Sequence, residues 1–155
     1  MQPEFTQKAT NALGYAKSAA KALKQGYIGT EHILLGLLKE QTGIAAKVLA
    51  DNEVSYDRTL DMIRELIAFD GGVSVKEREG YTPRAMKILD EAHAQAKRFG
   101  HKQTGTEHIL MALIKENENV ALRLLNTMEV SVNKVYAEVL QAIGADPNLY
   151  KEDLG

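Results

Sequence analysis

Apolar residues recur at helical spacing in eight separate stretches of the chain, and no stretch shows the sustained alternation expected of a strand. The first stretch carries so many alanines that it predicts a helix approached closely by its neighbours. Only three prolines interrupt the 155 residues. The pattern predicts an all-α fold, and its first half contains helices over about 7–24, 31–40, 44–51 and 56–69.

The second half of the chain repeats the first. The motif Gly-Thr-Glu-His-Ile-Leu stands at 29–34 and again at 105–110, 76 positions later. Holding that offset without a gap aligns 5–55 with 81–131, and 20 of the 51 aligned pairs are identical. Average composition would give roughly three. Both copies must share one fold, which predicts eight helices in two tandem four-helix repeats.

The repeat also sets the expected domain boundaries. The first repeat covers 1–69 and the second covers 81–143. Between them, 70–80 contains three glycines and alternating charges without an apolar period, which predicts an exposed linker. The polar tail over 144–155 is typical of a linker toward a further domain, so we expect an excised domain rather than a complete chain.

Residues that favour helix N-caps precede most of the apolar stretches. Proline follows one of them at position 83, where it gives up only an N–H that has no helical partner. The sequence predicts N-caps at six positions: Thr6, Thr30, Ser55, Thr82, Thr106 and Ser131.

Charge and composition exclude several classes of protein. Nineteen Lys and Arg against 21 Asp and Glu give a net charge of −2, so no bulk basic field favours nucleic acid. The absence of Cys excludes disulfides and thiolate chemistry and fits a reducing compartment. Apolar runs such as 33–35 are too short to span a bilayer, and 1–4 does not resemble a signal peptide. We expect a soluble, cytoplasmic chain whose partners are neither nucleic acid nor membrane.

Catalytic motifs are missing from the sequence: it has no Walker-type loop, no His-Glu-x-x-His pair and no nucleophile elbow. A zinc site without thiolates would need imidazoles and carboxylates to converge from separate helices. We therefore expect no catalytic residue, no metal and no cofactor, and we expect capping or packing roles for the histidines, which are His32, His93, His101 and His108.

The repeated Gly-Thr-Glu-His is open to two interpretations. In the structural one, glycine makes a turn, threonine caps a helix and glutamate lies at the positive helix end. In the functional one, the helix N-termini opened by Thr6 and Thr82 suit a phosphate, and the glutamate suits a cation. A ligand that joins phosphate to guanidinium could use both groups. Spacing alone does not bring these threonines and glutamates together.

The chain resembles the N-terminal domains of ClpC-type AAA+ unfoldases, which work with the protease ClpP. The resemblance covers about 4–144. Its carriers are Phe5-Thr6 before an alanine-rich helix, the doubled Gly-Thr-Glu-His-Ile-Leu motif, the segment Gly43-Ile-Ala-Ala-Lys-Val-Leu49, and Tyr81-Thr-Pro-Arg-Ala85 at the start of the second copy.

The resemblance implies a fold with pseudo-two-fold symmetry and a domain that receives adaptor proteins and substrates before ATP-driven unfolding. It also implies one phosphoarginine pocket per repeat. Glu31 and Glu107 would hold the guanidinium, and Thr6 and Thr82 would hold the phosphate. Because the second copy departs further from the family pattern, we expect a Thr6/Glu31 pocket to be the more typical binder.

Other functions remain open at this stage. The chain could be a free-standing adaptor or decoy related to these domains, or an adaptor-docking module that never binds phosphoarginine. The sequence names no particular adaptor or substrate. Since the ATPase domains build the ring of the parent unfoldase, we expect the isolated chain to be a monomer.

Overall fold

The computed structural model of the protein describes residues 3–69 and 80–155, so the predicted linker lies outside the described residues except for Gly80. The first repeat contains β1 (Glu4–Phe5), α1 (Gln7–Ala22), α2 (Thr30–Glu40), α3 (Ile44–Asp51) and α4 (Tyr56–Phe69). The second contains α5 (Pro83–Arg98), β2 (Gln103–Thr104), α6 (Thr106–Lys115), α7 (Val120–Thr127), α8 (Val132–Ala142) and the 3-10 helix η1 (Pro147–Leu154). The predicted all-α fold of two tandem four-helix repeats is confirmed.

Side-chain caps set several helix starts. Thr6 Oγ1 accepts a hydrogen bond from the backbone N–H of Ala9, and Thr82 Oγ1 accepts one from Ala85, both at 3.1 Å. Ser131 caps α8 in the same way. These three predicted caps are confirmed, and each satisfies a helix N–H that has no partner within its own helix.

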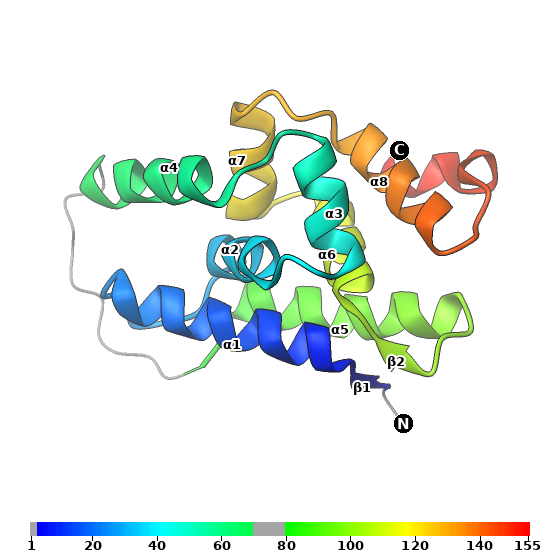
Figure 1. The fold of residues 1–155 in the computed structure, drawn as a ribbon, viewed down its shortest axis with the longest axis horizontal. Coiled ribbons are helices and arrows are strands. Elements are labelled where there is room, and N and C mark those ends of the chain that lie inside the picture. The colour runs from blue at the N-terminus through cyan, green and yellow to red at the C-terminus, as the bar shows by residue number, and fades with distance from the viewer. Residues whose placement is uncertain (1–2, 70–79) are drawn as a thin grey trace.

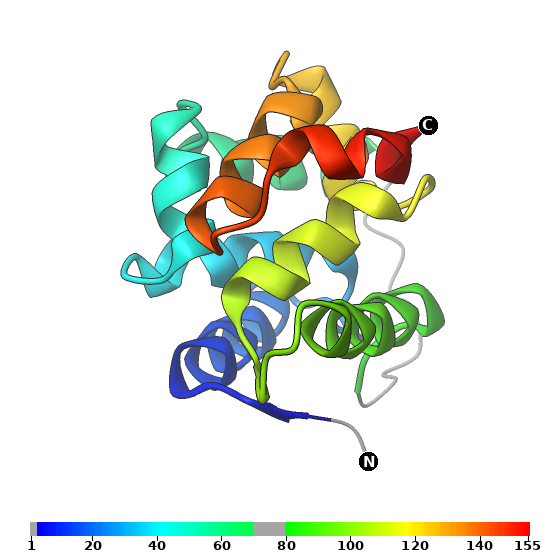
Figure 2. The same cartoon turned by 90° about the vertical axis from the view of Figure 1, so that its right-hand side faces the viewer.

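The equivalent helices of the two repeats pair in layers. Figures 1 and 2 show α1 and α5 at one level, α2 and α6 in the middle, and α3, α4, α7 and α8 on the opposite side. No helix in the described part of the chain has the length and apolarity to cross a membrane.

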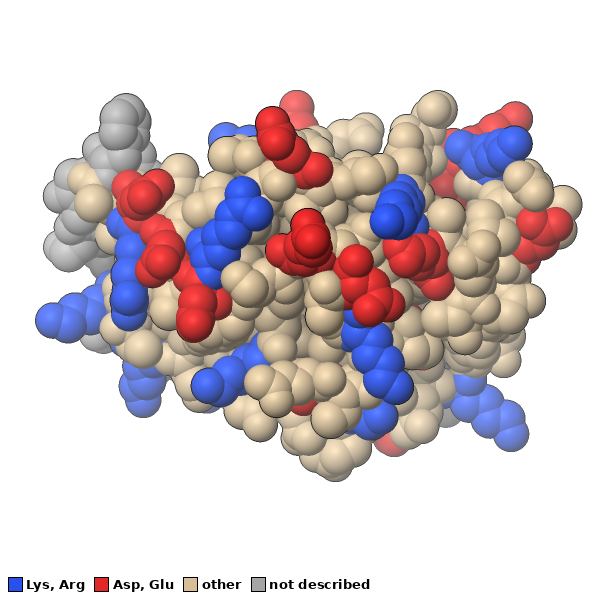
Figure 3. All heavy atoms as spheres, turned by 45° about the horizontal axis from the view of Figure 1, so that its top comes forward, with Lys and Arg blue, Asp and Glu red and all other residues tan. Residues whose placement is uncertain are grey.

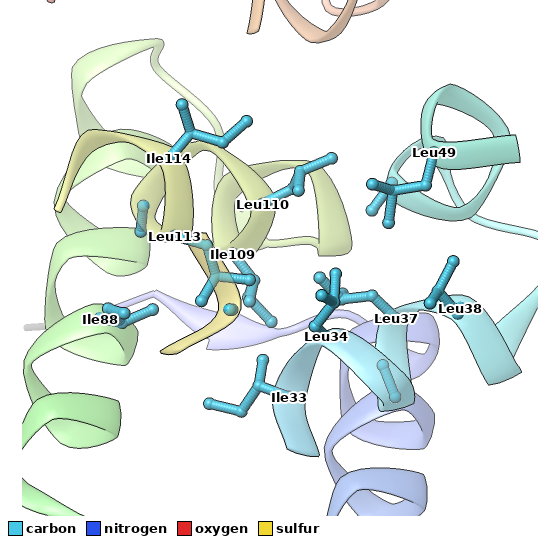
Figure 4. Close-up of a cluster of buried hydrophobic side chains, with 14 of the residues drawn as sticks. Ile33, Leu34, Leu37, Leu38, Leu49, Ile88, Ile109, Leu110, Leu113 and Ile114 are labelled. Carbon is cyan, nitrogen blue, oxygen red and sulfur yellow. The ribbon is translucent and has the colours of Figure 1, made fainter. Parts of the chain in front are cut away.

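The two central helices supply most of the largest fully buried side chains among the described residues (Figure 4). Both are apolar around nearly their whole circumference, which suits helices enclosed by others. Large side chains from both repeats are fully buried together, including Ile33, Leu34, Leu37, Leu49, Ile88, Ile109, Leu110 and Leu113. The two repeats therefore share one core.

The alanine-rich face of α1 lets α2 approach its backbone closely, as predicted. A Cβ placed on Gly36 of α2 would lie 2.1 Å from the carbonyl oxygen of Ala12. Glycine is required at position 36 for this contact, although it weakens a helix interior. The second repeat has Ala112 at the equivalent position, so its first two helices do not need so close an approach.

Each repeat begins by pairing its backbone with a loop of the other repeat. β1 pairs in parallel with β2, and Phe5 lies opposite Thr104. An isolated parallel bridge joins Ile28 to Tyr81, and these are the same two repeat positions with the repeats exchanged. Such reciprocity is what a two-fold relation produces. These pairs are too short to show as alternation in the sequence.

The tail is not a free linker along its whole length. η1 folds back onto the second repeat, and Arg98 of α5 donates to both carboxylate oxygens of Asp153 at 2.8 and 3.0 Å. Tyr136 of α8 donates to the same carboxylate, and the Arg98 guanidinium lies over the ring of Tyr150. A charge-assisted, two-point hydrogen bond gives the tail this fixed position.

The two helix glycines of the first repeat provide a matched test of the packing. We expect Gly36→Ala to lower the free energy of unfolding by about 1–3 kcal/mol, since its methyl group would overlap the α1 backbone. Gly14 of α1 has open space around its Cα, so Gly14→Ala should raise the free energy by about 0.5–1 kcal/mol. Urea denaturation of both variants measures the difference, and equal effects would contradict the close approach.

Candidate functional site

The histidine of each Gly-Thr-Glu-His motif caps its own helix. The backbone N–H of Gly29 donates to Nδ1 of His32 at 2.8 Å, and Gly105 donates to His108 at the same distance. Both imidazoles are almost completely buried. The predicted capping role of these two histidines is confirmed, and glycine, not threonine, is the N-cap residue of α2 and α6.

The threonine of each motif caps a helix of the other repeat. Thr30 Oγ1 accepts from the backbone N–H of Ala121 in α7 at 3.2 Å, and Thr106 Oγ1 accepts from Ala45 in α3 at 3.4 Å. The prediction that these threonines cap their own helices was therefore wrong. Thr30 is the first residue of α2, and Thr106 is the first residue of α6. The start of each of these helices lies against the other repeat, beside first-turn N–H groups of α7 and α3, respectively, that have no partner within their own helix.

The glutamate of each motif folds over the glycine two positions before it. A Cβ on Gly29 would lie 2.0 Å from Oε1 of Glu31, and a Cβ on Gly105 would lie 2.0 Å from Oε1 of Glu107. Burial raises the pKa of Glu31, while a hydrogen bond from its own backbone N–H and the nearby Arg123 act in the opposite direction. The glycines thus leave the space that these carboxylates occupy, and a Cβ at either position would displace the glutamate side chain.

Glu31 lies in a pocket of about 670 Å³, here called pocket A, that both repeats enclose. The first repeat contributes the start of α2, and the second contributes the starts of α5 and α7 together with the loop before α7. The lining residues are Tyr27, Gly29, Thr30, Glu31, Thr82, Arg84, Asn117, Glu118, Asn119, Val120 and Arg123.

Glu107 lies in a smaller pocket of about 220 Å³, here called pocket B. Its lining residues are Thr6, Lys8, Thr42, Gly43, Ile44, Lys47, Thr106 and Glu107. Every one of these has its repeat equivalent, 76 positions away, in the lining of pocket A. The two pockets are therefore the same site built twice with the repeats exchanged.

Each pocket joins the glutamate of one repeat to the threonine of the other. Thr82 lies with Glu31 in pocket A, and Thr6 lies with Glu107 in pocket B. Thr6 and Glu31, which were expected to share a pocket, therefore line different ones, and each of these two pockets lies between the repeats rather than within one. The physical reason is the exchange of capping threonines, which inserts the start of α2 and of α6 into the opposite repeat.

Two basic side chains in each pocket were missed by the sequence analysis. They are Arg84 and Arg123 in pocket A, and Lys8 and Lys47 in pocket B. The offset of 76 carried a signal, because both pairs of equivalent positions keep a positive charge while changing between Lys and Arg. Each pocket thus combines at least one carboxylate, two cations, threonines and the N-termini of helices, which suits a ligand with an anionic and a cationic end.

The two motif histidines differ at their second ring nitrogen. Since Nδ1 accepts, Nε2 carries the proton. His108 donates it to Nδ1 of His101 at 2.7 Å, whereas the buried Nε2 of His32 has no hydrogen-bond partner among the described residues. Burial lowers the pKa of both His32 and His108 to about 4. Within residues 3–69 and 80–155, no group of His, Asp and Glu side chains is arranged to hold a metal ion.

Two four-helix repeats that exchange caps and enclose a pair of equivalent pockets define a double-repeat helical domain. A family model described as the Clp repeat N-terminal domain matches residues 4–79 and again 80–154. The chain belongs to this family. The second match extends to the end of η1, beyond the expected boundary at 143.

Relatives in bacteria agree with this assignment. The chain is 42% identical to ClpC/MecB of Bacillus subtilis, a negative regulator of genetic competence, over 142 residues. It is 39% identical to the Clp protease ATP-binding subunit ClpC of Staphylococcus epidermidis over 144 residues, and 41% identical to the chaperone ClpB of Oceanobacillus iheyensis over 142 residues. These matches cover 91–92% of the chain but 17% of each relative. The resemblance to ClpC-type N-domains is confirmed.

Solved structures show the same fold. The N-terminal domain of ClpD from Arabidopsis thaliana has a TM-score of 0.73 at 18% identity, covering 90% of this chain and 97% of that one. The N-domain of ClpV from Vibrio cholerae has a TM-score of 0.67 at 14% identity, covering 92% and 87%. At these identities the likeness concerns the fold alone.

The exchanged cap has a measurable local effect. We expect Thr30→Val to lower the free energy of unfolding by about 1 kcal/mol and to accelerate amide exchange at Ala121, because that N–H loses its acceptor in the other repeat. Thr127→Val, on the exposed side of α7, is the matched control. Unchanged exchange at Ala121 in the Thr30 variant would contradict the cross-repeat cap.

The buried histidines predict acid sensitivity. Between about pH 6.5 and 4 the unfolded chain binds protons at His32 and His108 that the folded chain does not, so stability falls as the pH falls through this window. Each histidine contributes up to about 1.4 kcal/mol per pH unit. Replacing both by asparagine, which keeps an acceptor near the Nδ1 position, should flatten urea-denaturation stability between pH 7 and 5. A slope equal to that of the wild type would overturn this assignment.

Proposed function

We propose that this chain is the substrate- and adaptor-recognition domain of a ClpC-type unfoldase, and that pockets A and B bind phosphoarginine on marked proteins. The observation that carries the proposal is that each pocket holds a carboxylate together with two basic side chains beside a threonine-capped helix N-terminus. Phosphoarginine is a single group with matching charges at its two ends.

The phosphate end would use the positive side of each pocket. In pocket B, Lys8 and Lys47 line the pocket together with Thr6, where α1 begins with N–H groups that have no helical partner. In pocket A, Arg84 and Arg123 take the same positions, and arginine adds a planar donor pair suited to phosphate oxygens. Pro83 removes one first-turn donor from pocket A, while Gln7 retains it in pocket B.

The guanidinium end would use the carboxylates of Glu31 and Glu107. Both carboxylates occupy the space left open by the glycine two positions earlier. Charge-assisted hydrogen bonds at both ends of one ligand discriminate against ligands that lack either end. Unmodified arginine would lose the phosphate contacts, and phosphoserine would lose the guanidinium contacts.

In this role the chain recognises substrates and adaptors, and other parts of the longer protein carry out the ATP-driven steps. The relatives are several times longer than the chain and include Clp protease ATP-binding subunits. We infer that unfolding by an ATPase and transfer to ClpP belong to those other parts, and that adaptor proteins dock on this domain. The alternative of an adaptor-docking module without phosphoarginine binding is an outcome of the test below.

Calorimetric titration of the chain with free phosphoarginine tests the proposal. We expect two bound ligands per chain, one in each pocket, and no saturable binding of arginine or phosphoserine. Glu31→Ala and Glu107→Ala should each remove one site, because each pocket loses its partner for the guanidinium.

Glu53 and Glu129 occupy equivalent positions outside both pockets, so Glu53→Ala and Glu129→Ala are the matched controls and should keep both sites. Absence of phosphoarginine binding to the wild-type chain would overturn the proposed ligand. The pockets would then be folding features, and adaptor docking would remain as the function of the domain.

A further inference from the structure

The two pockets differ in how a glutamate beside each of them is used. Glu40 and Glu116 occupy the same repeat position, just before the turns that lead into α3 and α7. Glu40 turns inward and is buried. Its Oε1 accepts from the backbone N–H groups of Gly43 at 2.6 Å and Thr42 at 3.2 Å, and the Thr42 hydroxyl donates to its Oε2. This carboxylate is committed to capping the start of α3.

Glu116 does not cap the start of α7, because Asn119 does so instead. Asn119 stands where the first repeat has Gly43, and its side chain caps α7 directly by accepting from the Leu122 N–H at 2.8 Å. The same amide donates to the carbonyl oxygens of Leu113 at 2.9 Å and Glu116 at 3.0 Å. Since glycine offers no side chain, the first repeat needs Glu40 for the turn, whereas the second does not need Glu116.

The freed carboxylate pairs with a basic residue of pocket A. Glu116 Oε1 lies 2.9 Å from Nζ of Lys87 and 3.5 Å from Nη1 of Arg84. Lys8, the equivalent of Arg84 in pocket B, has no ion pair within the described part of the chain and donates only to the carbonyl oxygen of Thr42 at 3.4 Å. One of the two cations of pocket A is thus already partly neutralised.

A second carboxylate adds to the difference. Glu118 lines pocket A at the position that Thr42 occupies in pocket B. Pocket A therefore contains two cations and two carboxylates, and pocket B contains two cations and one carboxylate. Figure 3 shows acidic and basic side chains lying close to one another on one face of the molecule.

We propose that Glu116 is a specificity-determining residue that competes with a phosphorylated ligand for Arg84, so that pocket B is the tighter phosphoarginine site and pocket A the weaker one. The inference rests on the proposed function. A dianionic phosphate gains from free cations and is repelled by carboxylates nearby, and both effects favour pocket B. Because the competing pair is partly exposed, the difference should shrink as salt is added.

The test measures the phosphoarginine affinity of each pocket separately. Phosphoarginine is titrated into Glu31→Ala, which keeps pocket B, and into Glu107→Ala, which keeps pocket A. We expect the tighter binding in Glu31→Ala. Adding Glu116→Gln to Glu107→Ala should strengthen binding about two- to fivefold, the range of an exposed ion pair. The matched control is Glu91→Gln in the same background, since Glu91 pairs with Lys115 outside the pocket and should leave the affinity unchanged.

The failures of the two proposals are distinguishable. If neither single-pocket variant nor the wild type binds phosphoarginine, the proposed ligand is wrong and the inference falls with it. If both pockets bind but pocket A is equal or tighter, or if Glu116→Gln changes affinity no more than Glu91→Gln, the competition is refuted and the proposed function stands. Circular dichroism of each variant confirms that a loss of binding is not a loss of fold.

Discussion

The structure depends on a reciprocal exchange of two threonine hydroxyls. Thr30 caps α7 and Thr106 caps α3, so each repeat completes the helix start of the other. Both threonines are almost completely buried, where an N–H left without an acceptor is costly. The same exchange recurs in the strand pairs, with the N–H of Thr6 donating to Thr104 at 2.9 Å and that of Thr82 donating to Ile28 at 3.0 Å. Each repeat therefore has backbone N–H groups whose acceptors lie in the other repeat.

The pockets are a consequence of this exchange. To reach α7, the start of α2 must enter the second repeat, and it brings Glu31 to the basic side chains at the starts of α5 and α7. The reverse insertion brings Glu107 to Lys8 and Lys47. Within the motif Gly-Thr-Glu-His, glycine leaves space, threonine and histidine cap helix starts, and glutamate lines the pocket, where we propose that it binds the ligand. The two interpretations of the motif are compatible.

Local features of the fold could be predicted from the sequence, and distant ones could not. The helices over 44–51 and 120–127 and the caps at Thr6 and Thr82 agree with prediction because apolar spacing and cap chemistry act within one turn. The partner of Thr30 is 91 residues away, and no local pattern encodes that contact. The prediction that Thr6 shares a pocket with Glu31 failed for the same reason. The candidate threonines and glutamates came from family resemblance. The basic residues share a charge between the repeats, but only the fold places them in the pockets.

The central claim is that each proposed binding pocket lies between the repeats, and counting bound ligands in paired variants tests it most directly. Arg123 and Glu31 belong to different repeats but to one pocket, whereas Arg123 and Glu107 belong to one repeat but to different pockets. Calorimetric titration with phosphoarginine should find one intact site in the Glu31→Ala/Arg123→Ala variant and none in Glu107→Ala/Arg123→Ala. The opposite result, with the site surviving in the second variant and both sites lost in the first, would contradict the account.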